Sequence, residues 1–235
     1  MAKKKSAYMT PAERVGGTIF LLIYLLALPL LAHRLFALLG TLLGVTIGDS
    51  LENILFYYLL FAVTLLLFHR FLWNTTRIFF ENLNGALVTL CVSLLLFYGA
   101  NELFYRVANV LMGSRVNLND VAIAAQVNAA PRMTGLIILF LAPFVEEVLF
   151  RGLVFGCLRS SGRVLAYLLS CALFAFLHVW TYALSGWDLS YFVLMLQYLV
   201  PGFVFAWAYD RSGTLWTSIL LHGLVNALSM WTMLS

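Results

Sequence analysis

Residues 133–157 read MTGLIILFLAPFVEEVLFRGLVFGC, and this stretch decides the class of the protein. It is apolar over a length that suffices to cross a bilayer as a helix, for which about 20 residues are needed. Yet Glu146, Glu147 and Arg151 lie inside it, and a charged side chain near the bilayer centre costs roughly 2.5–3.5 kcal/mol. Charged groups that persist at this cost are expected to have a function.

The composition of the whole chain indicates the same class. Of its 235 residues, 63% are hydrophobic and 10% are charged, and the mean hydropathy is +0.96, whereas soluble domains carry about 25% charged residues. We therefore predict an all-α polytopic membrane helical bundle without a separate soluble domain. The net charge of +4 comes from basic residues spread over short loops, which argues against a nucleic-acid partner.

The apolar runs predict about seven spanning helices, with six to eight as the range. The predicted spans are residues 15–32, 51–69, 83–104, 133–157, 164–184, 189–209 and 214–234. A shorter patch, Leu35 to Ile47, either extends the first helix or lies at the membrane interface. The chain is then divided into a basic segment at 1–14, the N-terminal helices with an external loop at 15–132, and a core at 133–235, all within one membrane domain.

The charges of the loops predict the orientation through the positive-inside rule. A cytoplasmic N-terminus places more basic residues inside than outside. The inner set is Lys3, Lys4, Lys5, Arg14, Arg70, Arg77, Arg159, Arg163 and Arg211, and the outer set is Arg34, Arg106, Arg115 and Arg132. We therefore expect the N-terminus inside and the C-terminus outside.

The charged residues of span 133–157 have a definite geometry on a helix. Glu147 and Arg151 are four residues apart and share one face, in the favourable order of acid before base. Glu146 is rotated by about 100° from its neighbour and has no local partner. Pro143 frees a carbonyl group one turn earlier and is expected to bend the helix toward a polar cavity. The plainer interpretation is a structural salt bridge with a second acid facing a neighbouring helix.

Two later spans carry further polar groups. His178 lies in span 164–184, one turn after Phe174, and His222 and Asn226 lie four residues apart on one face of span 214–234. Taken separately, each is equally well explained as a hydrogen bond between membrane helices, worth roughly 1–2 kcal/mol. In the predicted orientation, however, these groups and Glu146 fall within roughly 10 Å of one depth. We therefore expect them to converge on one water-filled pocket.

The converging groups suit a particular chemistry. A carboxylate and an imidazole together can activate a water molecule, and a second imidazole with a carboxamide can donate to an oxyanion. This set describes peptide-bond hydrolysis without a covalent intermediate. One carboxylate with two imidazoles also forms a plausible zinc set, but the sequence has no HExxH motif, so we expect no cofactor and keep zinc as the lesser alternative. The cysteines, Cys91, Cys157 and Cys171, have no metal-type spacing and are expected to pack as small apolar residues.

Three motifs carry a resemblance to a known family. The sequence EEVLFR at 146–151 resembles the EExxxR motif of the CPBP group, the CAAX proteases and bacteriocin-processing enzymes also called the Abi family. FAFLH at 174–178 resembles its FxxxH motif, and HGLVN at 222–226 its HxxxN motif, in the family's order. The resemblance covers about residues 133–230, and makes 133–235 the catalytic core.

The resemblance implies a metal-independent, glutamate-type intramembrane endopeptidase similar to the type II CAAX prenyl protease. It implies that Glu146 and His178 activate water and that His222 and Asn226 form the oxyanion site. The implied supporting residues are Glu147, Arg151 and Phe174. Its substrate is expected to be a membrane-associated peptide or a lipid-modified protein, and the short chain resembles a bacterial, multi-pass cell-membrane member.

Two other functions remain as alternatives. A non-catalytic immunity or partner-binding protein would use the same fold to sequester a bacteriocin or sensor. A transporter would use the paired acids as a proton relay, but symmetry-related discontinuous helices are not evident in the sequence. Gly152 and Gly156 form a small-xxx-small pair, which permits close helix approach within the chain or between chains.

Overall fold

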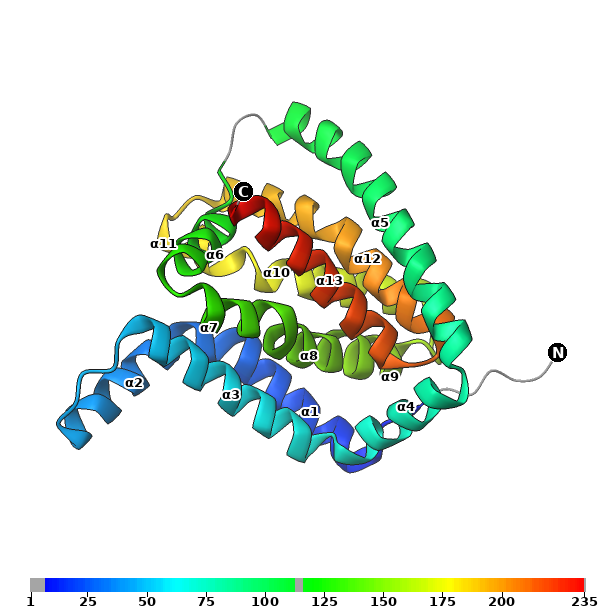
Figure 1. Cartoon of the computed structure of the whole chain (residues 1–235), viewed down its shortest axis with the longest axis horizontal. Helices are drawn as coiled ribbons and strands as arrows, with labels where there is room; N and C mark the ends of the chain where they lie inside the picture. The colour runs from blue at the N-terminus through cyan, green and yellow to red at the C-terminus, as the bar shows by residue number, and fades with distance from the viewer. Residues whose placement is uncertain (1–6, 113–115, 235) are drawn as a thin grey trace.

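The computed structural model describes residues 7–112 and 116–234, which form a bundle of helices without a β-strand in these ranges (Figure 1). The predicted all-α polytopic bundle is therefore confirmed. Four of the basic residues used to predict the orientation lie outside the described residues, namely Lys3, Lys4, Lys5 and Arg115. The orientation stays a prediction.

The first membrane helix is longer than the sequence indicated. It runs through α1 (Pro11–Leu22), a π-helical stretch η1 (Ile23–Ala27) and α2 (Leu28–Leu43). Thr10 and Glu13 cap its start reciprocally, since each accepts a hydrogen bond from the other's backbone N–H. Gly44, in the left-handed region at φ 68°, ends it. The apolar patch from Leu35 thus extends the first helix, and α3 (Asp49–Leu67) returns beside it.

A helix that was not predicted, α4 (His69–Glu81), follows α3 at the end of the bundle (Figure 1). It is amphipathic, because Phe71, Leu72 and Ile78 are buried while Arg70 and Trp73 are exposed. At 13 residues it is too short to span a bilayer. We expect an amphipathic helix of this kind to lie at the membrane surface, and its pattern differs from the long apolar runs that indicate spanning helices.

Two helices occupy most of residues 106–132, which were predicted to form a connection outside the spans. Helix α5 (Leu83–Met112) continues eight residues beyond the predicted end at 104 and crosses the outside of α12 and α13 (Figure 1). A short helix, α6 (Leu118–Ala129), begins at the cap residue Asn117. Most of the described part of the connection is therefore helical.

The stretch that carries the two acids forms the central helix of the bundle, drawn in green in Figure 1. It runs from Pro131 to Leu158 and buries 72% of its most apolar window, whereas the other candidate spans among the described residues bury 17–33% of theirs. Its parts are α7 (Pro131–Leu136), η2 (Ile137–Leu141), α8 (Ala142–Glu147), η3 (Val148–Phe155) and α9 (Gly156–Leu158), of which η2 and η3 are π-helical.

The predicted span 164–184 is wrong as a single helix. Helix α10 (Arg163–Leu177) ends just before His178, and a short helix α11 (Trp180–Ser185) follows. The cause is local: Phe174 O, which would accept the backbone N–H of His178 in a continuing helix, accepts the ring Nδ1–H instead at 2.8 Å. The backbone N–H of His178 turns to Ala175 O, so the chain leaves the helix at the histidine.

Two helices complete the bundle beside the central one. A 3₁₀ turn η4 (Leu189–Leu194) leads into α12 (Met195–Ser212), and α13 (Leu215–Leu234) ends the described chain. Five stretches of the described residues are long and apolar enough to cross a membrane, and α10 is shorter at 15 residues. Helix α13 falls outside this set although it has 20 residues and packs within the bundle. The count of seven spanning helices therefore stays a prediction.

Candidate active site

Glu147 lies at the centre of the polar cluster and is fully buried. Its Oε1 forms an ion pair with Arg151 Nη1 at 3.1 Å, so the predicted pair at this spacing is present. The same oxygen lies 2.9 Å from His222 Nδ1, and the hydroxyl of Ser218 donates to Oε2. A buried carboxylate is stable when its lone pairs are satisfied in this way. Glu147 is thus held in place from its own helix and from α13.

Arg151 is the second fixed group. Its Nη2 donates to Gly202 O at 3.0 Å, and its guanidinium lies over the ring of Phe174 at 4.4 Å and near that of Phe205 at 5.3 Å. Aromatic faces stabilise a desolvated cation in this position. Its charge is thus compensated by Glu147 and covered by aromatic rings.

His222 is oriented by the same carboxylate. Its ring stacks on Phe205 with centroids 4.5 Å apart, and its Nδ1 faces Glu147. With a carboxylate accepting at Nδ1, the proton of the neutral ring lies on that nitrogen, and Nε2 is an acceptor. Nε2 can donate to an oxyanion only when the ring carries both protons.

Asn226 has a contact that the sequence did not predict. Its Nδ2 donates to Ile138 O at 2.7 Å. The hydrogen bonds of η2 are π-helical, because Ala142 N–H donates to Ile137 O, five residues earlier. With the same spacing, the backbone N–H of residue 143 would donate to Ile138 O. Pro143 has no N–H, and the carboxamide of Asn226 occupies the vacant place. One amide hydrogen of Asn226 is used in this contact, and the other is left for the site.

Glu146 and His178 face each other across a short gap. Glu146 Oε2 is buried without a hydrogen-bond partner and lies 3.9 Å from His178 Nε2. Because His178 Nδ1–H donates to Phe174 O at 2.8 Å, Nε2 is a bare acceptor in the neutral ring. Two acceptors at this separation cannot bond each other, but one water molecule can donate to both at ordinary lengths of about 2.8 Å.

The structure brings the predicted residues together around one aromatic ring. The ring centroid of Phe174 lies 4.7 Å from that of His178 and 5.8 Å from that of His222. Glu146, His178 and His222 therefore lie close together, whereas the hydrogen bond of Asn226 is made with Ile138 O. The water-filled pocket stays a prediction. The described residues contain no group of three or more His, Cys, Asp or Glu placed to hold a metal ion. The expectation of a metal-independent site stays a prediction.

Other residues of the site were missed by sequence reasoning. Ser218 had a signal, because it lies four residues before His222 on the same face of α13. Tyr198 of α12 had none; it stacks on His178 with centroids 4.5 Å apart, and its hydroxyl accepts from Asn117 Nδ2 at 2.8 Å. The N-terminal helices also contribute residues to the surroundings of the site.

Two tyrosines of the N-terminal helices lie near Glu146. Tyr24 of η1 and Tyr57 of α3 lie close enough to Glu146 to interact with it electrostatically. In the sequence both residues are part of spans distinguished only by their hydrophobicity. The site is therefore bordered by both halves of the chain.

The segment that contains the three motifs matches a known protein family. Residues 128–228 match the family described as type II CAAX prenyl endopeptidase, Rce1-like. This segment is thus similar to the Rce1-like family. The recognition from the three motifs is thereby confirmed, and the matched segment contains every predicted site residue.

Two curated bacterial proteins are similar to this chain. The "Putative membrane peptidase YdiL" of Bacillus subtilis (strain 168) is 30% identical over 113 residues, which cover 48% of this chain and 41% of the relative. The "UPF0177 protein YxdF" of Lactococcus lactis subsp. lactis (strain IL1403) is 30% identical over 86 residues, covering 37% and 42%. The chain thus matches less than half the length of each relative. No solved structure matches. With its apolar helices and bacterial relatives, the chain is a multi-pass membrane protein.

Proposed function

We propose that this protein is an intramembrane endopeptidase that hydrolyses a peptide bond in a membrane-associated peptide or a lipid-modified protein. The observation that carries the proposal is the gap of 3.9 Å between Oε2 of the buried Glu146 and Nε2 of the partly buried His178. A free carboxylate oxygen with a bare imidazole nitrogen at this separation suits a single water molecule. The family of residues 128–228 supports the same chemistry.

In the proposed reaction the water donates one proton to Glu146 while its oxygen attacks the scissile carbonyl carbon. His178 Nε2 accepts the second hydrogen bond of the water and orients its lone pair. The carbonyl π electrons move to the oxygen, which becomes an oxyanion. Glu146 then returns the proton to the amide nitrogen as the C–N bond breaks, and an acid and an amine leave.

The oxyanion is proposed to lie against His222 and Asn226. His222 contributes an Nε2–H, while its Nδ1 on the other side of the ring is held against Glu147. Asn226 contributes the amide hydrogen that does not bond Ile138 O. Glu147 and Arg151 do not react in this scheme, because both are buried and engaged with each other.

The test compares membrane peptides from cells that produce the wild-type protein or Glu146→Gln. Glu146→Gln keeps the shape but removes the proton acceptor, so we expect peptides that depend on the wild-type protein to disappear. With a substrate found in this way, purified Glu146→Gln should turn over about 100 to 10,000 times more slowly. His178→Gln should be impaired in the same range.

The matched control is Glu102→Gln, which changes an exposed acid paired with Arg106 at 2.7 Å on α5. It should match the wild type in both measurements. Undiminished turnover in Glu146→Gln and His178→Gln would refute the proposal. If Glu146→Gln lacks turnover yet protects cells from a bacteriocin as well as the wild type does, the non-catalytic immunity function is favoured instead.

A further inference from the structure

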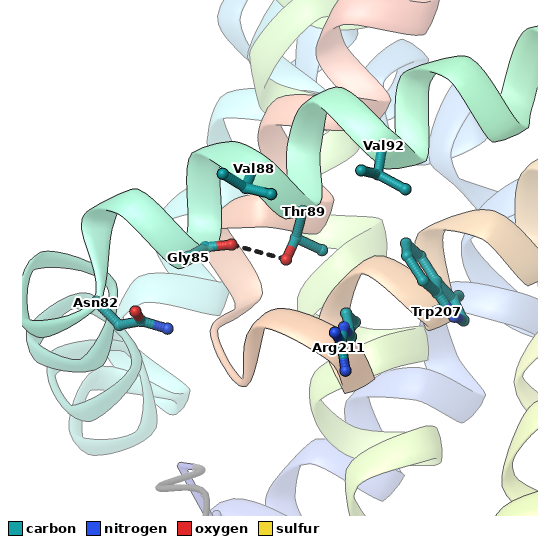
Figure 2. A pocket seen from close by; sticks show the side chains of 7 residues that line it. All are labelled: Asn82, Gly85, Val88, Thr89, Val92, Trp207 and Arg211. Carbon is teal, nitrogen blue, oxygen red and sulfur yellow. Dashed lines mark hydrogen bonds between the residues drawn. The ribbon is translucent and has the colours of Figure 1, made fainter.

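A groove outside the candidate active site opens between α5 and the end of α12 (Figure 2). Its volume is about 570 Å³. It is lined by Asn82, Gly85, Val88, Thr89, Val92, Trp207 and Arg211. None of these residues belongs to the three family motifs, so the groove is not explained by the proposed peptidase chemistry.

One end of the groove is polar and positively charged. Arg211 is exposed in the last turn of α12 and has no ion pair within the described part of the chain. The neighbouring acid, Asp210, is engaged elsewhere, with Arg163 at 3.8 Å and with the hydroxyl of Tyr167 at 3.4 Å. Asn82, just before the start of α5, adds an exposed carboxamide. The cation at this end therefore lacks a counter-charge among residues 7–112 and 116–234.

The rest of the groove is apolar. Val88 is 63% exposed and Val92 40% exposed on the side of α5 that borders the groove, and Trp207 faces them from α12 (Figure 2). The hydroxyl of Thr89 donates to Gly85 O at 2.7 Å, so its polar group is satisfied within the helix. No other polar side chain lines this wall.

The two ends differ in depth. Arg211 is one residue from the end of α12, and Asn82 directly precedes α5, so both lie where the helices meet the membrane surface. Trp207 is one turn deeper, by about 6 Å, and Val92 is ten residues beyond Asn82, about 15 Å deeper. The groove thus presents a cation at the headgroup level and an apolar channel below it. An indole at the boundary is typical of the membrane interface.

We propose that this groove binds one anionic phospholipid, with its phosphate on Arg211 and an acyl chain along Val88, Val92 and Trp207. Guanidinium groups bind phosphate with paired hydrogen bonds, and basic sites between membrane helices bind anionic headgroups. A zwitterionic lipid brings its own cation and leaves less net charge for the arginine to neutralise. The lipid fills the space between α5 and α12.

The experiment measures lipid retained by the purified full-length protein, by native mass spectrometry in detergent with phosphatidylglycerol or phosphatidylcholine added. The wild type should retain one phosphatidylglycerol in preference to phosphatidylcholine. Arg211→Gln should weaken this retention about fivefold, the effect of one basic residue at an anionic surface. Val92→Trp, which fills the apolar part, should reduce retention of either lipid.

The matched control is Arg70→Gln, which removes the same charge from an exposed position on α4 outside the groove. It should retain phosphatidylglycerol as the wild type does. Equal retention by Arg211→Gln, or no preference of the wild type between the lipids, would overturn the proposal. So would displacement of the lipid by inorganic phosphate, which indicates a free-anion site. If Arg211→Gln purifies poorly, Val92→Trp carries the same test with the arginine in place.

Discussion

Arg151 and Glu147 are both fully buried, and their charges compensate each other at 3.1 Å. Replacing Arg151 with methionine leaves the carboxylate in the core without its guanidinium. We expect a loss of about 3–5 kcal/mol in the free energy of unfolding, as for other buried pairs from which one partner is removed. The measurement is a denaturant titration of the purified protein in detergent micelles.

The double variant Glu147→Gln with Arg151→Met is the control for this prediction. It removes both charges together, so most of the lost stability should return. Peptidase activity should stay low, because His222 then lacks the carboxylate at Nδ1 that holds its ring in place. Strictly additive losses of stability in the two single variants would contradict the buried-pair explanation.

The sequence correctly predicted the pairs of residues that share a helix face, because this depends only on helical spacing. Glu147 and Arg151 share a face at four residues, as do His222 and Asn226, and the structure agrees. The stacking of Tyr198 on His178 was not predictable, because it depends on how α12 is placed beside the end of α10. The route of the chain after His178 sets that placement, and the hydrophobic pattern did not reveal it.

A second prediction concerns the coupling of two helices. Asn226 of α13 supplies the donor that Pro143 cannot supply to Ile138 O on the central helix. Asn226→Ala therefore leaves a partly buried carbonyl without this partner and should lower stability by about 1 kcal/mol. In a Pro143→Ala background, a backbone N–H is available at residue 143. Asn226→Ala should then lower stability much less.

Thermal unfolding of the four proteins, wild type, two single variants and the double variant, measures this coupling. An interaction energy of about 1 kcal/mol is expected, since the two residues serve one carbonyl group. Equal effects of Asn226→Ala in both backgrounds would show that Asn226 does not replace the missing donor. Asn226→Gln is a further comparison, because it keeps the amide but moves it out of reach.

Helix boundaries were predicted well where the hydrophobic pattern ends at a clear signal, and poorly where a side chain competes with the backbone. Helix α3 ends within two residues of its predicted end. Helix α10 instead stops at Leu177, because the ring of His178 takes Phe174 O. The same histidine that indicated the site therefore ended the helix that carries it, by a local contact between side chain and backbone that helical periodicity does not record.

In the whole molecule the N-terminal half completes the core of the family-matched half. Gly152 of the central helix lies against Phe71, and a Cβ there would come within 2.8 Å of this ring and 3.0 Å of Met9. A Cβ on Gly17 would lie 2.7 Å from Phe68 and 3.3 Å from Leu153. Gly152 of the small-xxx-small pair thus permits close approach within the chain. The central helix depends on both halves for its burial.

This dependence predicts how a divided chain behaves. Residues 116–235, expressed alone in a membrane, should be degraded or aggregate, because the face of η3 that packs on Met9, Phe68 and Phe71 is left uncovered. Co-expression with residues 1–112 should restore a complex that copurifies, since the contacts between the halves are non-covalent. Affinity capture through a tag on one half, followed by detection of the other, measures assembly.

A control variant makes this experiment specific to the packing at Gly152. Gly152→Leu, placed in the C-terminal half, forces a side chain into Phe71 and should prevent copurification, whereas Gly99→Ala in the N-terminal half should not, because nothing lies within 4 Å of a Cβ there. If residues 116–235 alone are stable and bind no N-terminal half, the site is formed by the family-matched segment without its cover. In that case Tyr24 and Tyr57 contribute nothing to the surroundings of Glu146.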